Sequence, residues 1–372
     1  MTDPSHAGSL LTIDLSAIVA NWRLIVQGVA PAKVAAVVKA DAYGLGAAQV
    51  APALAAAGCE TFIVATLDEG IALRQVLPEP VILVLNGPLP GTEGEFVAHS
   101  LVPVLNSLSQ ITGWATSTKA GSGAPAAALH IDTGMNRLGF DEAELDRLAA
   151  RPEVLAWVRP ILTLSHLACA DSRDHPMNAE QRARFIHLAG RLPAMPLSLA
   201  ASGGCFLGRT YHFDLVRPGA ALYGINPTPG RPNPMAQVVR LQGKILQVRD
   251  VDSPRTVGYG ASYHVAGPSR IATVALGYAD GWFRSLGNQG HGVLGGVKVP
   301  LVGRVSMDLA CFDVGAVPPA IACPGALVDL IGPEQSVDDV AAEAGTIGYE
   351  ILTALGRRHH RRWITGAGET AA

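Results

Sequence analysis

The sequence has few cysteines and lacks the spacings that mark common metal sites. Its 372 residues include only five cysteines, an odd number, at positions far apart in the chain: Cys59, Cys169, Cys205, Cys311 and Cys323. Neither a C-x-x-C pair nor an H-x-x-H motif occurs. Scattered single cysteines argue against a disulfide framework, and the missing spacings argue against zinc. We therefore expect reduced thiols, a cytoplasmic location and no metal.

Charge is also sparse. Charged residues make up 16% of the chain and the formal net charge is −3, so there is no basic footprint for nucleic acid or an anionic membrane. The first ten residues, "MTDPSHAGSL", lack the charged and apolar regions of a secretory signal, and no apolar run is long enough to span a membrane. These features predict a soluble intracellular protein, in which a few local basic groups could still hold a small anionic ligand.

The first two thirds of the chain alternate between short apolar runs and stretches with helical spacing. Eight runs occur, at 34–38, 61–65, 81–85, 101–105, 126–131, 160–165, 197–201 and 219–224, and helical spacing is clearest at 68–76, 141–150 and 178–190. Runs without polar alternation are typical of strands buried on both faces. Eight such strands interleaved with helices predict a (β/α)8 barrel of the TIM type, with an open doubly wound sheet as the alternative.

The composition changes at "NPTPGRPNP" (226–234), where four prolines in nine residues predict a domain linker. The segments that follow are rich in β-forming residues separated by turns, and they include one helix at 336–345, which is followed by "GYEILTALG" (348–356). A chain of this length usually forms two domains. We expect an N-terminal segment over 1–11, a barrel over 12–232 and a mainly β domain over 233–372, with a frayed C-terminus.

Unusual polar residues follow the predicted strands. Lys39 ends the run in "AVVKADAYGLG" (36–46), Arg137 lies in "DTGMNRLG" (132–139) after the fifth strand, and His166 follows the sixth. Ser202, Gly203 and Gly204 follow the seventh strand, and "RPGA" (217–220) lies at the eighth. The carboxyl ends of the strands form one rim of such a barrel, and active sites lie there. We therefore expect all of these residues to lie on that rim.

Each residue alone has an ordinary explanation. Lys39 could extend to solvent, His166 could be a hydrogen-bonded core histidine, Arg137 and Arg217 could form surface ion pairs, and Tyr43 could simply pack. Their expected position on the same rim of the barrel favours an active site. A desolvated lysine becomes a nucleophile or a base, and Ser202 with the backbone of Gly219 and Ala220 could cradle a phosphate. A reactive lysine opposite a phosphate cradle indicates pyridoxal 5′-phosphate (PLP).

The sequence resembles the alanine racemases, which are fold-type III PLP enzymes, across nearly its whole length. The motifs that carry the resemblance occur in order: "AVVKADAYGLG", "DTGMNRLG", "LSHLA", "VRPGAALYG", "VGYGASY", "GYADGW", "RVSMD" and "GYEIL". The first motif is fairly specific by itself, and the ordered set is highly specific.

The resemblance implies a role for each motif residue. Lys39 would bind PLP covalently and act as one base, and Tyr259, from the other subunit of a homodimer, would act as the second. Arg217 would bind the pyridine nitrogen, Arg137 the phenolic oxygen and the substrate, and His166 would bind the cofactor site and support Tyr259. The implied phosphate ligands are Tyr43, Ser202, Gly219, Ala220 and Tyr349. Met307 and Asp308 of the partner chain would position the substrate carboxylate, and Tyr278 would line the entrance.

These implied roles agree with the chemistry of racemisation. Inverting a stereocentre needs an acid–base group on each face of the carbon. Positive charge on His166 and Arg217 would favour the ionised form of a catalytic tyrosine. Arg217 does not give up its proton, so the pyridine nitrogen would stay unprotonated.

Two positions depart from the family pattern. Many relatives carry a carbamylated lysine two residues before the aspartate of "DTGM"; here that residue is His130, so we expect no carbamylation. The usual asparagine before the phosphate-site serine is Ala201. The expected function is racemisation of alanine for peptidoglycan synthesis, with a different specificity, such as serine, as the alternative. A fold-type III decarboxylase and a PLP-homeostasis protein fit less well, because the chain has "VGYGASY" and the second domain.

Overall fold

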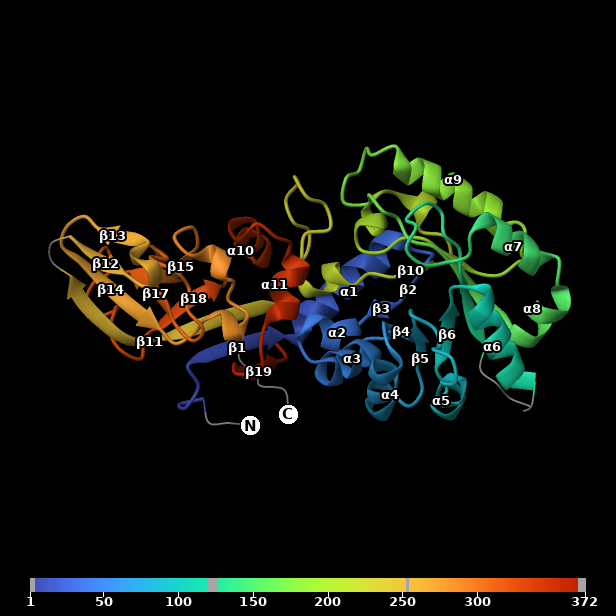
Figure 1. Cartoon of the computed structure of the whole chain (residues 1–372), viewed down its shortest axis with the longest axis horizontal. Coiled ribbons are helices and arrows are strands. Elements are labelled where there is room, and N and C mark those ends of the chain that lie inside the picture. Colours follow the sequence, from blue (N-terminus) through green and yellow to red (C-terminus); the bar gives the residue numbers. More distant parts are fainter. Residues whose placement is uncertain (1–3, 120–125, 252–253, 367–372) are drawn as a thin grey trace. The chain divides into compact units, whose positions relative to one another are not determined.

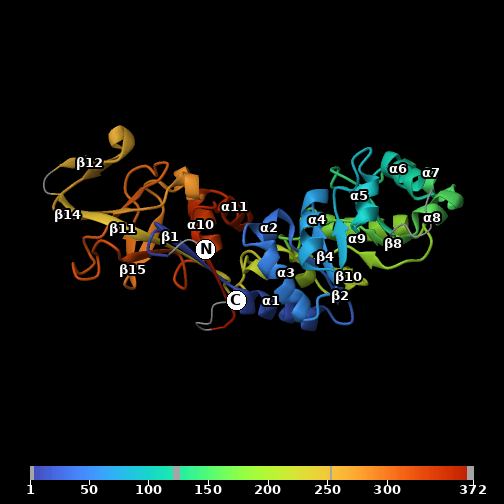
Figure 2. The same ribbon diagram turned by 90° about the horizontal axis from the view of Figure 1, so that it is seen from below.

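The structure, a computed structural model, describes residues 4–119, 126–251 and 254–366, which fall into two compact units (Figures 1 and 2). The barrel unit comprises Ile18–Leu222 and Asn226–Ala236, and the β-rich unit comprises the described parts of Met1–Ala17, Tyr223–Ile225 and Gln237–Ala372. The expected fraying of the last residues lies outside the described part of the chain. No helix within the described ranges is long and apolar enough to cross a membrane.

The barrel unit is built on parallel strands that run in sequence order. They are β2 (Lys33–Val34), β3 (Ala36–Val37), β4 (Thr61–Val64), β5 (Val81–Val84), β6 (Val102–Leu105), β7 (Ala127–His130), β8 (Pro160–Leu164), β9 (Leu197–Ser198) and β10 (Leu215–Val216). The amide of Arg217 donates to the Ala200 carbonyl, and that of Ala35 donates to the Val216 carbonyl, both at 2.9 Å. These bonds join β9 to β10 and β10 to the first strand. The predicted barrel is confirmed.

Helices lie outside the curled sheet of this unit (Figure 1). The helices of the first half of the chain are α1 (Leu15–Val29), α2 (Lys39–Tyr43), α3 (Ala47–Ala56), α4 (Leu67–Val76), α5 (Glu93–Ala98), α6 (Leu108–Lys119), α7 (Glu142–Ala149), α8 (Pro152–Val158) and α9 (Met177–Ala189). Capping boxes start α4, from Thr66 and Glu69, and α7, from Asp141 and Glu144. Thus the three helices predicted at 68–76, 141–150 and 178–190 are confirmed within one residue at each end.

The eighth predicted strand is wrong in position. The run 219–224 forms a 3-10 helix, η3 (Ala220–Tyr223), and β10 precedes it. Two causes are visible in the backbone: Pro218 has no amide hydrogen for a ladder, and the Gly219 and Ala221 amides donate to the Ser202 hydroxyl oxygen. Residues 220–223 are buried as a helix. Their apolar composition is therefore the same as that of a buried strand, although they form no strand hydrogen bonds.

The β-rich unit is a mainly antiparallel sheet arranged around one long strand. Its strands are β1 (Ser9–Asp14), β11 (Val239–Val251), β12 (Arg255–Val257), β13 (Tyr263–Val265), β14 (Ser269–Val274), β15 (His291–Leu294), β16 (Val297–Pro300), β17 (Ala310–Asp313), β18 (Leu327–Ile331) and β19 (His360–Ile364). β11 pairs with β1, β14 and β18, and β1 also pairs in parallel with β19. The helices are α10 (Val337–Ala344) and α11 (Gly348–Ala354). The prediction that the C-terminal part of the chain forms a mainly β domain is therefore confirmed.

A short hairpin of β12 and β13 carries the turn that contains Tyr259. Val257 and Val265 of the hairpin form a buried apolar cluster with Ile271 and Val302. Because Ile271 belongs to β14 and Val302 to the loop after β16, the cluster fixes the hairpin against these two segments. The turn itself is a 3-10 helix, η4 (Tyr259–Ala261). The packing anchors the base of the hairpin and leaves its turn at the surface.

Candidate active site

The segment after Lys39 is a left-handed helical turn. Ala40, Asp41 and Ala42 have φ of 53°, 53° and 55° with ψ near 50°, and Tyr43 has φ of 56°. A left-handed helical conformation costs about 1–2 kcal/mol per L-residue, so the surrounding structure must hold this turn in place. Strain of this kind at the end of a barrel strand is a feature of functional sites.

Two carboxylates hold the left-handed turn. One oxygen of Glu69 accepts a hydrogen bond from the Ala40 amide at 2.7 Å, and the other accepts from the Ala65 and Thr66 amides at 2.8 and 3.2 Å. At the other end, Asp41 accepts from the Ala47 amide at 2.8 Å. The turn is therefore tied to the start of α4 and to the start of α3. Glu69 was not among the predicted site residues, because its sequence position indicates only a helix cap.

The Lys39 side chain is half-buried at this rim. Burial lowers its pKa, the nearby Arg137 guanidinium lowers it further, and Glu69 opposes both. A larger fraction of the amine is thus neutral near pH 7 than for a lysine in water, which makes it a better nucleophile and base. The partial burial argues against a lysine that simply extends to solvent.

Arg217 is a buried guanidinium held by neutral groups. It donates to the Ser198 hydroxyl oxygen and, at 2.6 Å, to the Ser165 carbonyl oxygen. Burial lowers its pKa to about 10, so it stays protonated at pH 7. No carboxylate forms an ion pair with it within the described residues. A buried cation of this kind is costly unless a further acceptor is supplied, and an unprotonated ring nitrogen would be such an acceptor.

The predicted phosphate residues of the barrel meet at the ends of β9 and β10. The buried Ser202 hydroxyl oxygen accepts hydrogen bonds from the Gly219 amide at 3.0 Å and the Ala221 amide at 3.2 Å. A methyl group on Gly219 would lie 2.3 Å from the Tyr43 hydroxyl oxygen, so only bare backbone fits beneath that tyrosine. The structure therefore brings Tyr43, Ser202, Gly219 and Ala220 together in a cradle. A side chain at position 219 would fill it.

His166 is neutral in this site. Burial lowers its pKa to about 3, and Arg217, Arg137, His130 and Lys39 lower it in that order. Those four influences also show that the five side chains share one rim. Because His166 carries no charge at pH 7, the expectation that it supplies positive charge to a catalytic tyrosine is wrong. Its carbonyl is fixed by the Gln181 amide group at 2.9 Å.

The loop that carries Arg137 is rigid at its start. Asp132 accepts hydrogen bonds from the amides of Gly134, Met135 and Asn136 at 2.8 to 3.2 Å. The Arg137 side chain itself is exposed. Nearby, Asn106 accepts a hydrogen bond at 2.7 Å from His130, and this asparagine was missed by the sequence analysis. It directly follows the run 101–105, so the same strand-end rule would have identified it.

The remaining predicted residues belong to the β-rich unit. Tyr259 is 71% exposed on its hairpin turn, and Tyr278, Met307 and Tyr349 are also exposed. Two of them are neighbours, since the Tyr278 amide donates to the Ser306 carbonyl and the Ala279 amide to the Met307 carbonyl, both at 3.0 Å. Thus Tyr278, Met307 and Asp308 form one group of exposed loop residues, with Tyr349 separately on α11.

Arg358 holds the Tyr278–Asp308 group together. Its guanidinium makes two hydrogen bonds to Asp280, at 2.7 and 2.8 Å, and one to Asp308 at 2.7 Å. Asp280 in turn accepts from the Gly277 amide at 2.9 Å. Asp308, a predicted substrate residue, is therefore engaged in an ion pair. Arg358 was missed by the sequence analysis because its partners lie far away in the chain.

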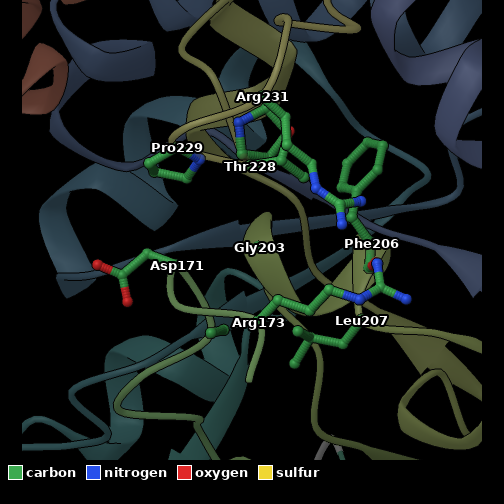
Figure 3. Close-up of a pocket in the computed structure, with 10 residues that line it drawn as sticks. Asp171, Arg173, Gly203, Phe206, Leu207, Thr228, Pro229 and Arg231 are labelled. Atoms are coloured by element: carbon green, nitrogen blue, oxygen red, sulfur yellow. The ribbon is translucent and has the colours of Figure 1, made fainter. Parts of the chain in front are cut away.

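A pocket opens beside the Gly203 backbone of the barrel unit (Figure 3). Arg173 and Arg231 extend toward Phe206 on one side, whereas Asp171 lies on the other (Figure 3). Arg173 donates to the Phe206 carbonyl at 3.1 Å. Arg173 and Arg231 give one wall of this pocket positive charge.

Comparisons with known proteins match both parts of the chain. Residues 13–227 match the family model of the alanine racemase N-terminal domain, and residues 238–363 match that of the C-terminal domain. The chain is 55% identical to an alanine racemase of Rhodospirillum rubrum, with 98% of each chain covered. It is 50% identical to a catabolic alanine racemase of Mesorhizobium japonicum, with 97% of this chain and 94% of the relative covered.

A solved structure is similar over nearly the same length. The alanine racemase of Bartonella henselae, with covalently bound pyridoxal phosphate, superposes with a TM-score of 0.93 at 42% identity, covering 96% of this chain and all of the other. Sequence and structural similarity therefore agree over both units of the chain.

Proposed function

Because the chain belongs to the alanine racemase family, we propose that it uses PLP and interconverts L-alanine and D-alanine with two acid–base residues, Lys39 and Tyr259 of the partner subunit in a homodimer. The observation that carries the proposal is the state of Lys39. This half-buried lysine with a lowered pKa shares its rim with Arg217, a buried cation that forms no ion pair within the described residues.

The residues of the barrel unit fit the cofactor. Ser202, Gly219 and Ala220 would hold the phosphate, with Tyr43 packed beside them and Tyr349 contributed by the β-rich unit. Arg217 would donate to the ring nitrogen and keep its own proton, because its pKa of about 10 is far above neutral pH. When bound, PLP supplies the electron withdrawal that weakens the Cα–H bond of the amino acid attached to it.

The two bases divide the proton transfers between the faces of the substrate. Lys39 would remove or return the proton on one face of the α-carbon, and Tyr259 of the partner subunit would do so on the other. Arg137, together with Met307 and Asp308 of the partner subunit, would orient the carboxylate, and Tyr278 would line the entrance. The high exposure of Tyr259 in the single chain supports a role that a partner completes.

The proposed biological role is the supply of D-alanine for peptidoglycan in the cytoplasm. Serine is the second candidate substrate. We propose an N-terminal segment over 1–11, a barrel domain over 12–232 and a β-rich domain over 233–372. β1 (Ser9–Asp14) spans the boundary between the first two ranges and pairs in the sheet of the third.

Circular dichroism of an L-alanine solution tests the activity. With purified enzyme and added PLP, the signal should decay to zero, and Lys39→Ala should abolish the decay. L-serine is measured in parallel. A constant alanine signal from folded, PLP-loaded enzyme would reject alanine as the substrate, and faster decay with serine would favour the second candidate.

A further inference from the structure

His359 links two segments that lie 350 positions apart in the chain. The imidazole comes directly before β19 and is buried. Its Nδ1 atom lies 2.8 Å from the hydroxyl oxygen of Ser9, the first residue of β1, and its Nε2 atom lies 2.8 Å from the backbone carbonyl oxygen of Asp280. Ser9 and Asp280 are buried as well. The ring therefore joins the first strand of the chain to the loop 277–281, which carries Tyr278.

The two contacts fix the tautomer of His359. A carbonyl oxygen can only accept a hydrogen bond, so Nε2 must carry the hydrogen. Burial lowers the pKa of this histidine and outweighs the hydrogen bond and the charge of Asp280, which raise it, and Arg361 and Arg358 lower it as well. The ring is thus neutral at pH 7 with a lone pair on Nδ1, to which the Ser9 hydroxyl donates.

Asp280 is the fixed point of the loop 277–281. Its carbonyl oxygen accepts from His359 and, at 3.0 Å, from the Gly356 amide, and its own amide donates to the Gly277 carbonyl oxygen at 3.0 Å. Its carboxylate accepts from Arg358 and from the Gly277 amide. Every polar atom of Asp280 is therefore bonded. The half-exposed Arg358 binds only the side chain, whereas the buried His359 binds the main chain.

This loop cannot shift alone. A methyl group on Gly277 would overlap the Met307 carbonyl oxygen, and one on Gly281 would overlap the Ala354 carbonyl oxygen at the end of α11. The loop is thus packed between the segment of Met307 and α11. A displacement of its backbone would move Tyr278 and Met307 together.

The hydrogen bond to the main chain gives His359 a role in the active site. We infer that His359 is a positioning residue, which holds the Asp280 carbonyl and so sets where Tyr278 lies in the active site of the partner subunit. Ser9 orients the imidazole, and Met307 follows the loop because the two segments are packed together. The inference rests on the proposed function, which assigns Tyr278 to the entrance and Met307 to the substrate.

Glutamine is the conservative replacement for this imidazole. Its neutral amide offers an N–H donor and an acceptor oxygen, about as far apart as the two ring nitrogens. Glutamine can therefore bind both Ser9 and Asp280, whereas leucine fills the space and binds neither. Comparing His359→Gln with His359→Leu separates the hydrogen bonds from the packing.

The tautomer can be tested without catalysis. In nitrogen-15 NMR of the PLP-loaded protein, with His359→Gln used to assign the signal, His359 should be protonated at Nε2 and unprotonated at Nδ1 near pH 7. A proton on Nδ1 would overturn the inference, whatever the substrate of the enzyme is.

The position of Tyr278 can be followed directly. With all seven tyrosines replaced by 3-fluorotyrosine, its fluorine-19 signal is assigned by its loss in Tyr278→Phe. His359→Leu should move or broaden this signal and His359→Gln should restore it, while the signal of Tyr211 in the barrel unit stays unchanged. An unchanged Tyr278 signal in folded His359→Leu would overturn the positioning role.

Kinetics with alanine test the effect on the site. His359→Leu should raise KM about tenfold, as expected for the loss of one hydrogen bond, while kcat stays within about twofold because the loop carries neither base. His359→Gln should recover most of this loss. Ser9→Ala should raise KM less, and it should have no further effect in the His359→Leu background, because Ser9 acts through the imidazole. Independent losses would contradict that coupling.

Gln237→Met is the matched control for general destabilisation. It removes two hydrogen bonds to main-chain carbonyl oxygens of the same unit, those of Val239 and Gly332, and should leave KM unchanged. An equal rise of KM in Gln237→Met and His359→Leu would overturn the positioning role. Failure of the proposed function looks different: the parent enzyme would then leave alanine unchanged, while the two NMR measurements would still decide whether His359 holds the loop.

Discussion

The Glu69 carboxylate accepts a hydrogen bond from the Ala40 amide at 2.7 Å, at the first residue of the left-handed turn that follows Lys39. A helix-capping residue thus also holds the strained backbone beside the Lys39 amine. Glu69→Gln removes one acceptor oxygen and the negative charge. We expect a loss of about 1–3 kcal/mol in unfolding free energy, measured with denaturant.

The same substitution should change Lys39. Glu69 raises the pKa of Lys39, so its removal should lower that pKa further and shift trapping of PLP by borohydride to lower pH. Glu60→Gln is the matched control, since Glu60 pairs with Lys33 at the surface and should change stability by less than about 1 kcal/mol. An unchanged trapping profile in Glu69→Gln would contradict the coupling.

Gly219→Ala should disrupt the phosphate cradle. The added methyl group would lie 2.3 Å from the Tyr43 hydroxyl oxygen, so the tyrosine must move. We expect PLP affinity, measured by fluorescence titration, to fall at least about tenfold. Gly28→Ala, on α1 with no atom within 4 Å of the new methyl, should leave affinity intact and raise stability by up to about 1 kcal/mol.

Arg358→Met should loosen the Tyr278–Asp308 group. Asp280 is only 6% exposed and would lose two hydrogen bonds, at an expected cost of about 1–3 kcal/mol of stability. KM for alanine should rise as well, because Asp308 loses its partner. Arg240→Met is the control. It removes the two hydrogen bonds between Arg240 and Asp329 and should leave KM unchanged. An equal KM effect in both variants would indicate general destabilisation.

Mixing two inactive variants should test the shared site. Lys39→Ala and Tyr259→Phe each remove one of the two proposed bases, and a dimer with one copy of each has one intact pair if the pairs form between subunits. Refolding or exchanging a one-to-one mixture should restore about a quarter of parental activity. No restoration, with mixed dimers demonstrated by mass spectrometry, would place both bases of a site in one chain.

Buried His166 should make stability depend on pH. Its folded pKa of about 3 lies below the ordinary value of 6.5, so the unfolded chain binds a proton first as the pH falls. Stability should therefore decrease from about pH 6.5 downward, by up to about 1.4 kcal/mol per pH unit from this group. His166→Asn should reduce that slope in denaturant unfolding. An unchanged slope would mean that His166 is protonated in the folded state.

The sequence predicted the barrel because its strands are buried on both faces and leave uninterrupted apolar runs. The run 219–224 was misassigned because a buried 3-10 helix has the same composition. The conformation of 40–43 had no local signal either, since alanine and tyrosine do not favour positive φ and aspartate adopts it only as a single residue. The hydrogen bonds of Glu69 and Asp41, which depend on the fold around them, hold this turn.

The rim residues Lys39, Arg137, His166 and Arg217 were found because strand ends can be read from a sequence. Their electrostatics could not be read in that way. The neutrality of His166 depends on burial and on four neighbours that lie at or after the ends of β3, β7 and β10. The roles of His359 and Arg358 likewise depend on which segments meet, and that is decided by the tertiary structure.

The first strand of the chain has both of its partners far downstream, in β11 and β19. On the ribosome, β1 emerges first and must wait while the whole barrel is translated before β11 appears. Its other neighbour, β19 (His360–Ile364), is translated later still, after the other strands of that sheet. The barrel strands are therefore all translated before the sheet around β11 can be completed.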